Sequence, residues 1–183
     1  MFFLSKGIKV HEVPPIIQVS HRGTVHTLAG EAGILWLSGQ YGPHFLAART
    51  KCFDALVELG LVETSDETTE LARYRLLTNC VICLTHGPLR RPKTVQEQTI
   101  LKWLRYAGLR LTVAELICLA EKQIMPVTSL LGKGNRQALV EAIYTIDNIT
   151  DMVLECQMEH AERRDATLDA IFRLLGENRI YLV

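Results

Sequence analysis

The sequence has no long apolar run and no excess of charge of either sign. None of its apolar stretches approaches the roughly 18 residues that a membrane-spanning helix needs, and the apolar start at Met1 is too short for a signal peptide. The 20 basic and 20 acidic residues leave a formal net charge of zero. This balance argues against strong non-specific DNA binding but allows a local basic face. We predict a protein of the cytoplasm with no membrane partner.

Cysteines are few and scattered, so no disulfide framework is visible. The five are Cys52, Cys80, Cys83, Cys118 and Cys156. An odd number spread over 183 residues fits buried thiols in a reducing compartment better than disulfides. Cys80 and Cys83 form a C-x-x-C pair with His86 nearby, but a closed zinc site needs four ligands and no second pair follows. We predict no metal site and no cofactor.

No motif of a known catalytic mechanism occurs in the sequence. A nucleophile elbow, a phosphate-binding loop and a dinucleotide glycine fingerprint are absent, and none of the six histidines forms an H-E-x-x-H pattern. We therefore predict a protein that is not an enzyme, and we assign no catalytic residue. Because catalytic histidines can lie far apart in a sequence, an enzyme of another fold remains a third hypothesis.

The chain is long enough for one large domain or two small ones, and 48% of its residues are apolar. Two prolines, a glycine and three basic residues separate two different patterns at residues 86–93. We take residues 87–93 as a linker. It joins a first domain, residues 1–86, to a second domain, residues 94–183.

The second domain is predicted to be helical. Thr94 with Glu97, and Thr112 with Glu115, have the spacing of a capping box, in which two side chains bind each other's helix-start amides. Apolar residues follow each box at helical spacing. Further helices are predicted over residues 135–146 and, as one or two helices, 150–175, before a strand at residues 180–183.

The first domain has the order helix, turn, helix, strand, polar loop and returning strand. Helices are predicted over residues 27–38 and from Pro43 to Leu59, with strands from Leu61 and over residues 74–84. The string Leu-Val-Glu-Leu-Gly-Leu-Val-Glu at residues 56–63 resembles the end of the recognition helix and the first wing strand of winged-helix transcriptional regulators. Arg-Tyr-Arg-Leu-Leu-Thr at residues 73–78 resembles their returning wing strand, and the resemblance covers residues 27–84.

The predicted fold is therefore mainly α with a small β hairpin, within the α+β class. It consists of a winged helix followed by a helical or a second winged-helix-like domain. The resemblance implies that double-stranded DNA lies against the second helix and the wing. Basic and hydroxyl side chains there, and in the linker, are the expected phosphate or base contacts. The predicted DNA-binding residues are Arg49, Thr50, Lys51, Arg73, Arg75, Arg90, Arg91 and Lys93.

The predicted wing is acidic, which opposes a DNA contact. Residues 63–70 include four carboxylates, and these would repel a phosphate backbone. A protein-interaction adapter built on the same fold, with a protein partner, is therefore the competing hypothesis to a DNA-binding transcriptional regulator.

The last predicted helix has an apolar stripe that suits a partner helix. The predicted dimerisation residues are Leu168, Ile171, Phe172 and Leu175. We predict a homodimer, since operators read by dimeric proteins are often palindromic.

Overall fold

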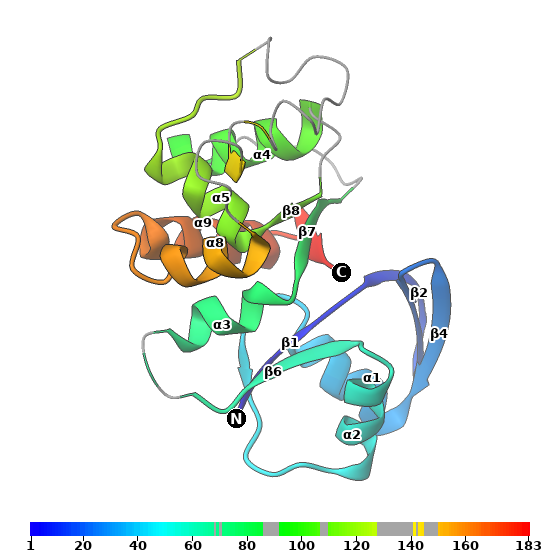
Figure 1. The fold of residues 1–183 in the computed structure, drawn as a ribbon. Helices are drawn as coiled ribbons and strands as arrows, with labels where there is room; N and C mark the ends of the chain where they lie inside the picture. The colour runs from blue at the N-terminus through cyan, green and yellow to red at the C-terminus, as the bar shows by residue number, and fades with distance from the viewer. Residues whose placement is uncertain are drawn as a thin grey trace.

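The computed structural model describes residues 1–67, 69, 71–85, 92–106, 110–127, 141, 143–144 and 150–183, and it is an α+β structure. Three small antiparallel sheets occur among these residues, together with helices (Figure 1). The prediction of a mainly α fold with one small β hairpin was wrong, because most of residues 1–29 lie in strands.

One sheet is an antiparallel meander with the strand order β2-β3-β4. It consists of β2 (Ile8–Val13), β3 (Ile16–His21) and β4 (Thr24–Ala29). Arg22 and Gly23 connect β3 to β4 with φ angles of 49° and 84°, as a type I′ hairpin turn requires. Alternate residues of β3 are buried, so one face of the sheet packs on the core and the other faces outward.

A second sheet has β1 (Phe2–Ser5) at its centre, in the order β5-β1-β6. Its neighbours are β5 (His44–Phe45) and β6 (Val62–Ser65), both antiparallel to β1. The turn after the first helix passes close to this sheet, because a Cβ atom on Gly39 would lie 2.6 Å from the ring of Phe3. Glycine is therefore the residue that fits at this position.

Helices α1 (Gly30–Ser38) and α2 (Lys51–Glu58) pack on each other and on the strands. The second helix was predicted to begin at Pro43, but the segment that follows this proline pairs with β1 as strand β5. The helix begins at Lys51 instead. There the hydroxyl of Thr50 accepts a hydrogen bond from the Phe53 amide at 3.3 Å and caps the helix.

The two strands predicted to form a wing hairpin do not pair with each other. β6 pairs with β1, and the segment after the polar loop is a helix, α3 (Ala72–Thr78), followed by strand β7 (Val81–Leu84). Tyr74 and Leu77 are both fully buried three residues apart, which is helical spacing. Burial of this stripe prevails over the strand propensity of the same residues. The winged-helix part of the fold prediction was therefore wrong.

The third sheet has the order β8-β7-β9, with β8 (Leu111–Thr112) and β9 (Ile180–Leu182) on either side of β7. The helices around it are α4 (Val95–Tyr106), α5 (Val113–Glu121), α8 (Asp151–Met158) and α9 (Arg164–Gly176). The predicted terminal strand is confirmed, and the predicted segment 150–175 forms two helices. The predicted helix over residues 135–146 falls mostly outside the described residues.

Both predicted capping boxes are present. At the start of α4, the Thr94 hydroxyl accepts from the Glu97 amide at 3.1 Å, and the Glu97 carboxylate accepts from the Thr94 amide at 3.4 Å. At the start of α5, Thr112 and Glu115 make the same exchange at 3.2 and 2.9 Å. These boxes satisfy helix-start amides within the local sequence, which is why spacing alone predicted them.

The carboxylate of Glu97 also joins α4 to α9. It is 1% exposed, and it accepts hydrogen bonds from the Lys93 amide and from Nε of Arg173, each at 2.7 Å. Burial by itself raises the pKa of Glu97, but the hydrogen bonds and the charge of Arg173 together hold this pKa below its ordinary value. The side chain is thus an ionised anchor between two helices.

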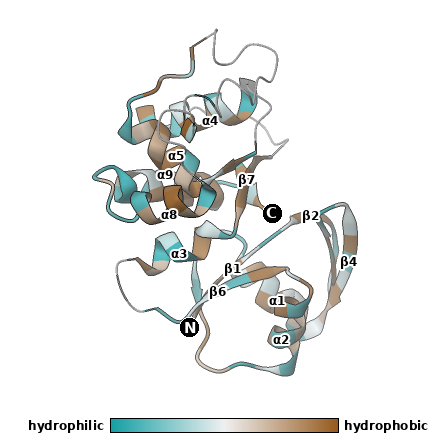
Figure 2. Ribbon diagram, viewed as in Figure 1, coloured by the Kyte–Doolittle hydropathy of each residue, from teal (hydrophilic) through white to brown (hydrophobic). Residues whose placement is uncertain are grey.

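Two apolar clusters form the interior of the protein. Figure 2 shows hydrophobic residues on the helices and strands that contribute to them. Phe3 belongs to the first cluster and Leu4 to the second, although they are neighbours on β1, since successive strand residues point to opposite faces. Apart from Leu4, the two clusters divide along the chain between Val62 and Tyr74, ahead of the predicted linker at residues 87–93. Within the described part of the chain, no helix has both the length and the apolarity needed to cross a bilayer.

Candidate phosphate-binding site

The three residues predicted on a recognition helix lie at the start of α2. Thr50 is its N-cap, and its hydroxyl is occupied by the Phe53 amide. Arg49 precedes the helix and is exposed, with its guanidinium 3.9 Å from the Asp54 carboxylate. Lys51 is exposed in the first turn. The three side chains therefore lie around a helix end rather than along one exposed face.

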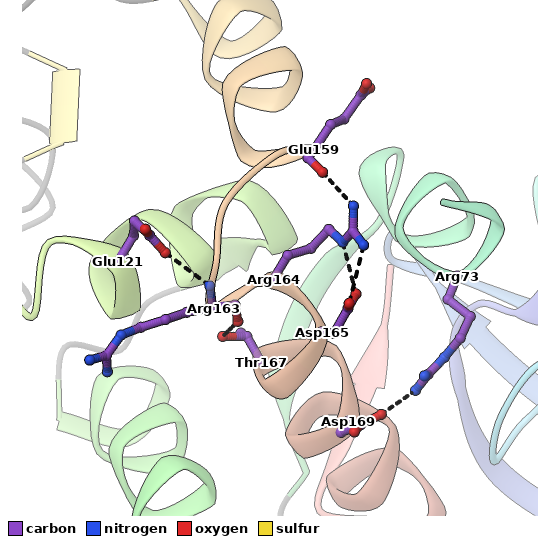
Figure 3. A network of polar contacts seen from close by, with 8 residues as sticks. All are labelled: Arg73, Glu121, Glu159, Arg163, Arg164, Asp165, Thr167 and Asp169. Carbon is purple, nitrogen blue, oxygen red and sulfur yellow. Dashed lines mark hydrogen bonds and ion pairs between the residues drawn. The ribbon is translucent and has the colours of Figure 1, made fainter. Parts of the chain in front are cut away.

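Arg73 and Arg75, predicted on the wing, lie on α3 and bind acidic residues of the C-terminal helices. Arg73 donates to Asp169 at 2.7 Å, as Figure 3 shows, and its guanidinium lies 4.9 Å from the ring centroid of Phe172. Arg75 pairs with Glu159 at 2.7 Å. Both arginines thus make contacts that hold α3 against the following helices, and their predicted contacts with DNA stay a prediction.

Of the predicted linker contacts, only Lys93 belongs to the described residues. Its ammonium group pairs with the Glu177 carboxylate at 2.8 Å. Arg90 and Arg91 lie outside the described part of the chain, so their predicted contacts are not placed.

The predicted dimerisation stripe on α9 faces the interior of the same chain. Leu168, Ile171 and Leu175 are 1%, 0% and 2% exposed and belong to the second apolar cluster. Phe172 is partly buried against that cluster and beneath Arg73. The stripe is therefore core, because the helical period that marks an interface also marks a helix packed on its own domain.

A basic pocket, which was not predicted from the sequence, occurs beside α4. Its described lining residues are Pro92, Gln98, Leu101, Lys102, Arg105 and Arg179. The pocket has a volume of about 160 Å³. Its three cations are accompanied by no carboxylate among these lining residues, so the local charge is positive although the chain as a whole is neutral.

Arg179 is held in this pocket by the backbone around it. Asn178 has a φ of 55° and turns the chain after α9, and the Arg179 amide then donates to the Leu174 carbonyl at 2.9 Å. The carbonyl of Arg179 accepts from the Thr85 amide at 3.0 Å. The residue therefore leads directly into β9, and its position is set by the third sheet.

The side chain of Arg179 is buried without a full set of partners. The residue is 8% exposed, and its Nη1 atom has no hydrogen-bond partner among the described residues. A guanidinium remains charged in proteins, and leaving a buried charge unpaired costs several kcal/mol. An anion is the group that would compensate this charge.

Lys102 and Arg105 supply the exposed side of the pocket. They are three residues apart on α4, so they lie on the same face of the helix, and both are exposed. Neither has an ion pair within the described part of the chain. Guanidinium groups bind phosphate oxygens through paired N–H donors, and a lysine adds a mobile charge. The arrangement is thus suited to one phosphate group.

Sequence reasoning named none of these three residues as a site. The spacing of Lys102 and Arg105 on a predicted helix is a weak signal, because such pairs are common on solvated helix faces. Arg179 gave no signal at all, since its burial depends on the packing of α4, α9 and the third sheet.

The cysteines form no metal-binding group among the described residues. All five are free thiols. Cys80 lies between α3 and β7 and is fully buried, and burial raises the pKa of its thiol to about 12. Cys83, on β7, is also buried, and no group of three or more possible metal ligands occurs in the part of the chain that is described.

Comparisons with models of protein families, with curated proteins and with solved structures found no significant match.

Proposed function

We propose that the chain is a non-enzymatic DNA-binding regulator of the cytoplasm that holds the phosphate backbone at the pocket of Lys102, Arg105 and Arg179. One observation carries the proposal: Arg179, whose buried Nη1 has no hydrogen-bond partner among the described residues, lines a pocket with two further cations and no carboxylate among its described lining residues. Phosphate contacts position a protein on DNA without reading its sequence. This site thus accounts for binding and leaves base recognition to other residues.

The sequence around the pocket favours a backbone contact over an isolated anion. Arg90 and Arg91 directly precede Pro92, which lines the pocket, and Arg110 follows α4 after three uncharged residues. Basic residues thus cluster in the sequence on both sides of α4. A row of phosphates would use such a cluster more fully than one free anion.

The test is fluorescence anisotropy of labelled duplex fragments, selected from a genomic pool, at about 50 mM and about 200 mM salt. The double variant Lys102→Gln/Arg105→Gln removes the two exposed cations without touching the core. Each phosphate contact contributes about 0.9 to the slope of log affinity against log salt. We therefore expect weaker binding and a slope smaller by about 1, for the one phosphate that the pocket holds.

Lys51→Gln is the matched control, because Lys51 is an exposed cation in the part of the chain where sequence reasoning had placed the DNA. It is expected to bind DNA as the wild type does. Loss of binding in Lys51→Gln with unchanged binding in the double variant would refute the pocket as the DNA site. Saturation by inorganic phosphate with no binding of duplex DNA would show a site for a free anion instead.

A protein-interaction adapter is the second candidate function, and the outer face of the β2-β3-β4 sheet favours it. Val13, Ile16 and Val25 are 56%, 42% and 56% exposed there, and the register places no charged residue beside them on this face. Interface cores are depleted of charged residues, so this face suits a protein partner.

The same sheet face is where we place the proposed homodimer contact. An uncharged face can meet a second copy of itself around a twofold axis without charge repulsion.

A further inference from the structure

A second cavity lies on the other side of α4, between α4, α5 and the start of α9. It has a volume of about 370 Å³, within the range of small-molecule sites. Its apolar wall includes Ile100, Trp103, Leu116, Leu119 and Ile124. The basic pocket is lined by different residues of α4, so the two sites are separate.

Gln96 and Thr167 of the wall are paired with each other, whereas Trp103 and Arg163 are two exceptions among its polar side chains. Gln96 donates to the Thr167 hydroxyl at 2.7 Å, and that hydroxyl donates to the Arg163 carbonyl at 2.8 Å. The first exception is the indole N–H of Trp103, which is 1% exposed and has no acceptor among the described residues. A buried donor without an acceptor destabilises the fold, and a hydrogen bond to a ligand oxygen would remove that cost.

The second exception is the guanidinium of Arg163, which also lines the cavity. The residue is exposed, and its backbone amide, not its side chain, donates to Glu121 at 3.0 Å. In Figure 3 the Arg163 side chain extends away from Glu121 and from the other acidic residues drawn. Among the described residues the guanidinium makes no ion pair, so it is available to an anion.

Arg163 and Trp103 both line the cavity, Trp103 from α4 and Arg163 from the start of α9. Arg163 is joined through Thr167 to Gln96, in the first turn of α4, and Trp103 lies seven residues further along the same helix. At the helical rise, seven residues correspond to about 10 Å. The wall of the cavity is largely apolar.

We propose that this cavity binds an elongated apolar carboxylate, with the carboxylate on Arg163 and a carbonyl or ether oxygen accepting from Trp103. The apolar middle of the ligand fills the space between α4, α5 and α9. Arg163 selects the negative charge and Trp103 selects an acceptor oxygen. This site stands independently of the DNA proposal, since it uses none of the same residues.

The two tryptophans allow a direct test by fluorine NMR of the full chain labelled with fluorotryptophan. Trp36 belongs to the first cluster and donates to the Lys6 carbonyl at 3.0 Å, so it serves as an internal reference. The probes are decanoate, decanoate with a ketone beside its terminal methyl group, and decanol, each below the concentration at which it aggregates. A saturable shift of the Trp103 signal with a constant Trp36 signal is expected for both carboxylates.

The relative affinities test each proposed contact. The keto acid should bind about tenfold more tightly than decanoate, because a satisfied buried donor contributes about one hydrogen bond. Arg163→Gln should weaken both carboxylates about tenfold and leave decanol unchanged. Arg22→Gln, an exposed cation on the β3-β4 turn, is the matched control and should change nothing.

Ala120→Phe fills the cavity from α5 and should abolish the Trp103 shift. No saturable shift in the wild type, or equal shifts of both tryptophans, would overturn the proposal without reference to any variant. Equal affinity of decanol and decanoate would overturn the role of Arg163. Equal affinity of the two acids would overturn that of Trp103.

Discussion

The burial of His21 predicts that the free energy of unfolding depends on pH. His21 lies on β3, is 5% exposed, and has no hydrogen-bond partner for either ring nitrogen among the described residues. Burial, and then the positive charges of Arg22 and Lys6 and the nearby His26, lower its pKa from 6.5 to about 4. The folded protein therefore holds this ring neutral over a pH range in which the unfolded chain protonates it.

The size of the effect follows from that shift. A lowered histidine pKa stabilises the fold fully above the unfolded pKa of 6.5, and this contribution falls as the pH drops towards about 4. Each pKa unit corresponds to about 1.4 kcal/mol, so the full contribution is roughly 3 kcal/mol. About 2 kcal/mol of it should be lost between about pH 7 and about pH 5.

The measurement is urea-induced unfolding of the wild type and of His21→Leu at several pH values in this range. Leucine cannot be protonated, so the free energy of unfolding of the variant should fall less steeply, by the roughly 2 kcal/mol that His21 contributes. Contributions from the carboxylates are common to both proteins and cancel in the difference. His11→Leu, at an exposed position of β2, is the matched control and should follow the wild type.

The outcome that contradicts this reasoning is a pair of parallel curves for the wild type and His21→Leu. A ring-proton NMR titration of the folded wild type gives an independent check. If His21 titrates near 6.5 in the fold, the ring is accessible to protons and the physical argument from burial fails.

Three further predictions concern the anchor, a tight contact and the proposed dimer. Glu97→Gln should lower the free energy of unfolding by about 2 kcal/mol, because it breaks the ion pair between Glu97 and Arg173, whose side chain is 45% exposed. An unchanged urea midpoint would contradict the role of the Glu97 charge. Gly39→Ala should cost about 2 kcal/mol by the same assay, since its Cβ would lie 2.6 Å from the Phe3 ring, and a neutral result would mean that the ring moves aside easily. Val25→Glu should convert a dimer into a folded monomer in light scattering, and a monomeric wild type would refute the sheet-face contact.

Local features of the fold were predictable from the sequence. The capping boxes at Thr94 and Thr112 depend on residues three positions apart, so spacing was sufficient to predict them. The stripe on α9 was also recognised as apolar and helical. The surface that the stripe packs against was not predictable, because the same stripe can form a dimer interface or a core. Only the packing of the second cluster decides between the two.

The segment of residues 73–78 shows why the overall fold was not predictable. Its residues suit a strand or a helix, and the resemblance to a wing strand favoured the strand. Tyr74 and Leu77 are buried together only as a helix, and their burial depends on α5 and α8, which lie far along the chain. Long-range packing therefore overrode the local preference.

The sequence by itself determined the two helix starts at Thr94 and Thr112, the placement of the terminal strand and a charge balance that rules out a uniformly basic surface. Only the tertiary structure decided which charged side chains form ion pairs. Arg73 and Arg75 were predicted to bind DNA but meet carboxylates from α9 and from the C-cap of α8, whereas Arg179 joins Lys102 and Arg105 where no described lining residue is acidic. The physical reason is that a charge acts through the groups within a few ångströms of it, and the fold, not the order of the residues, brings those groups together.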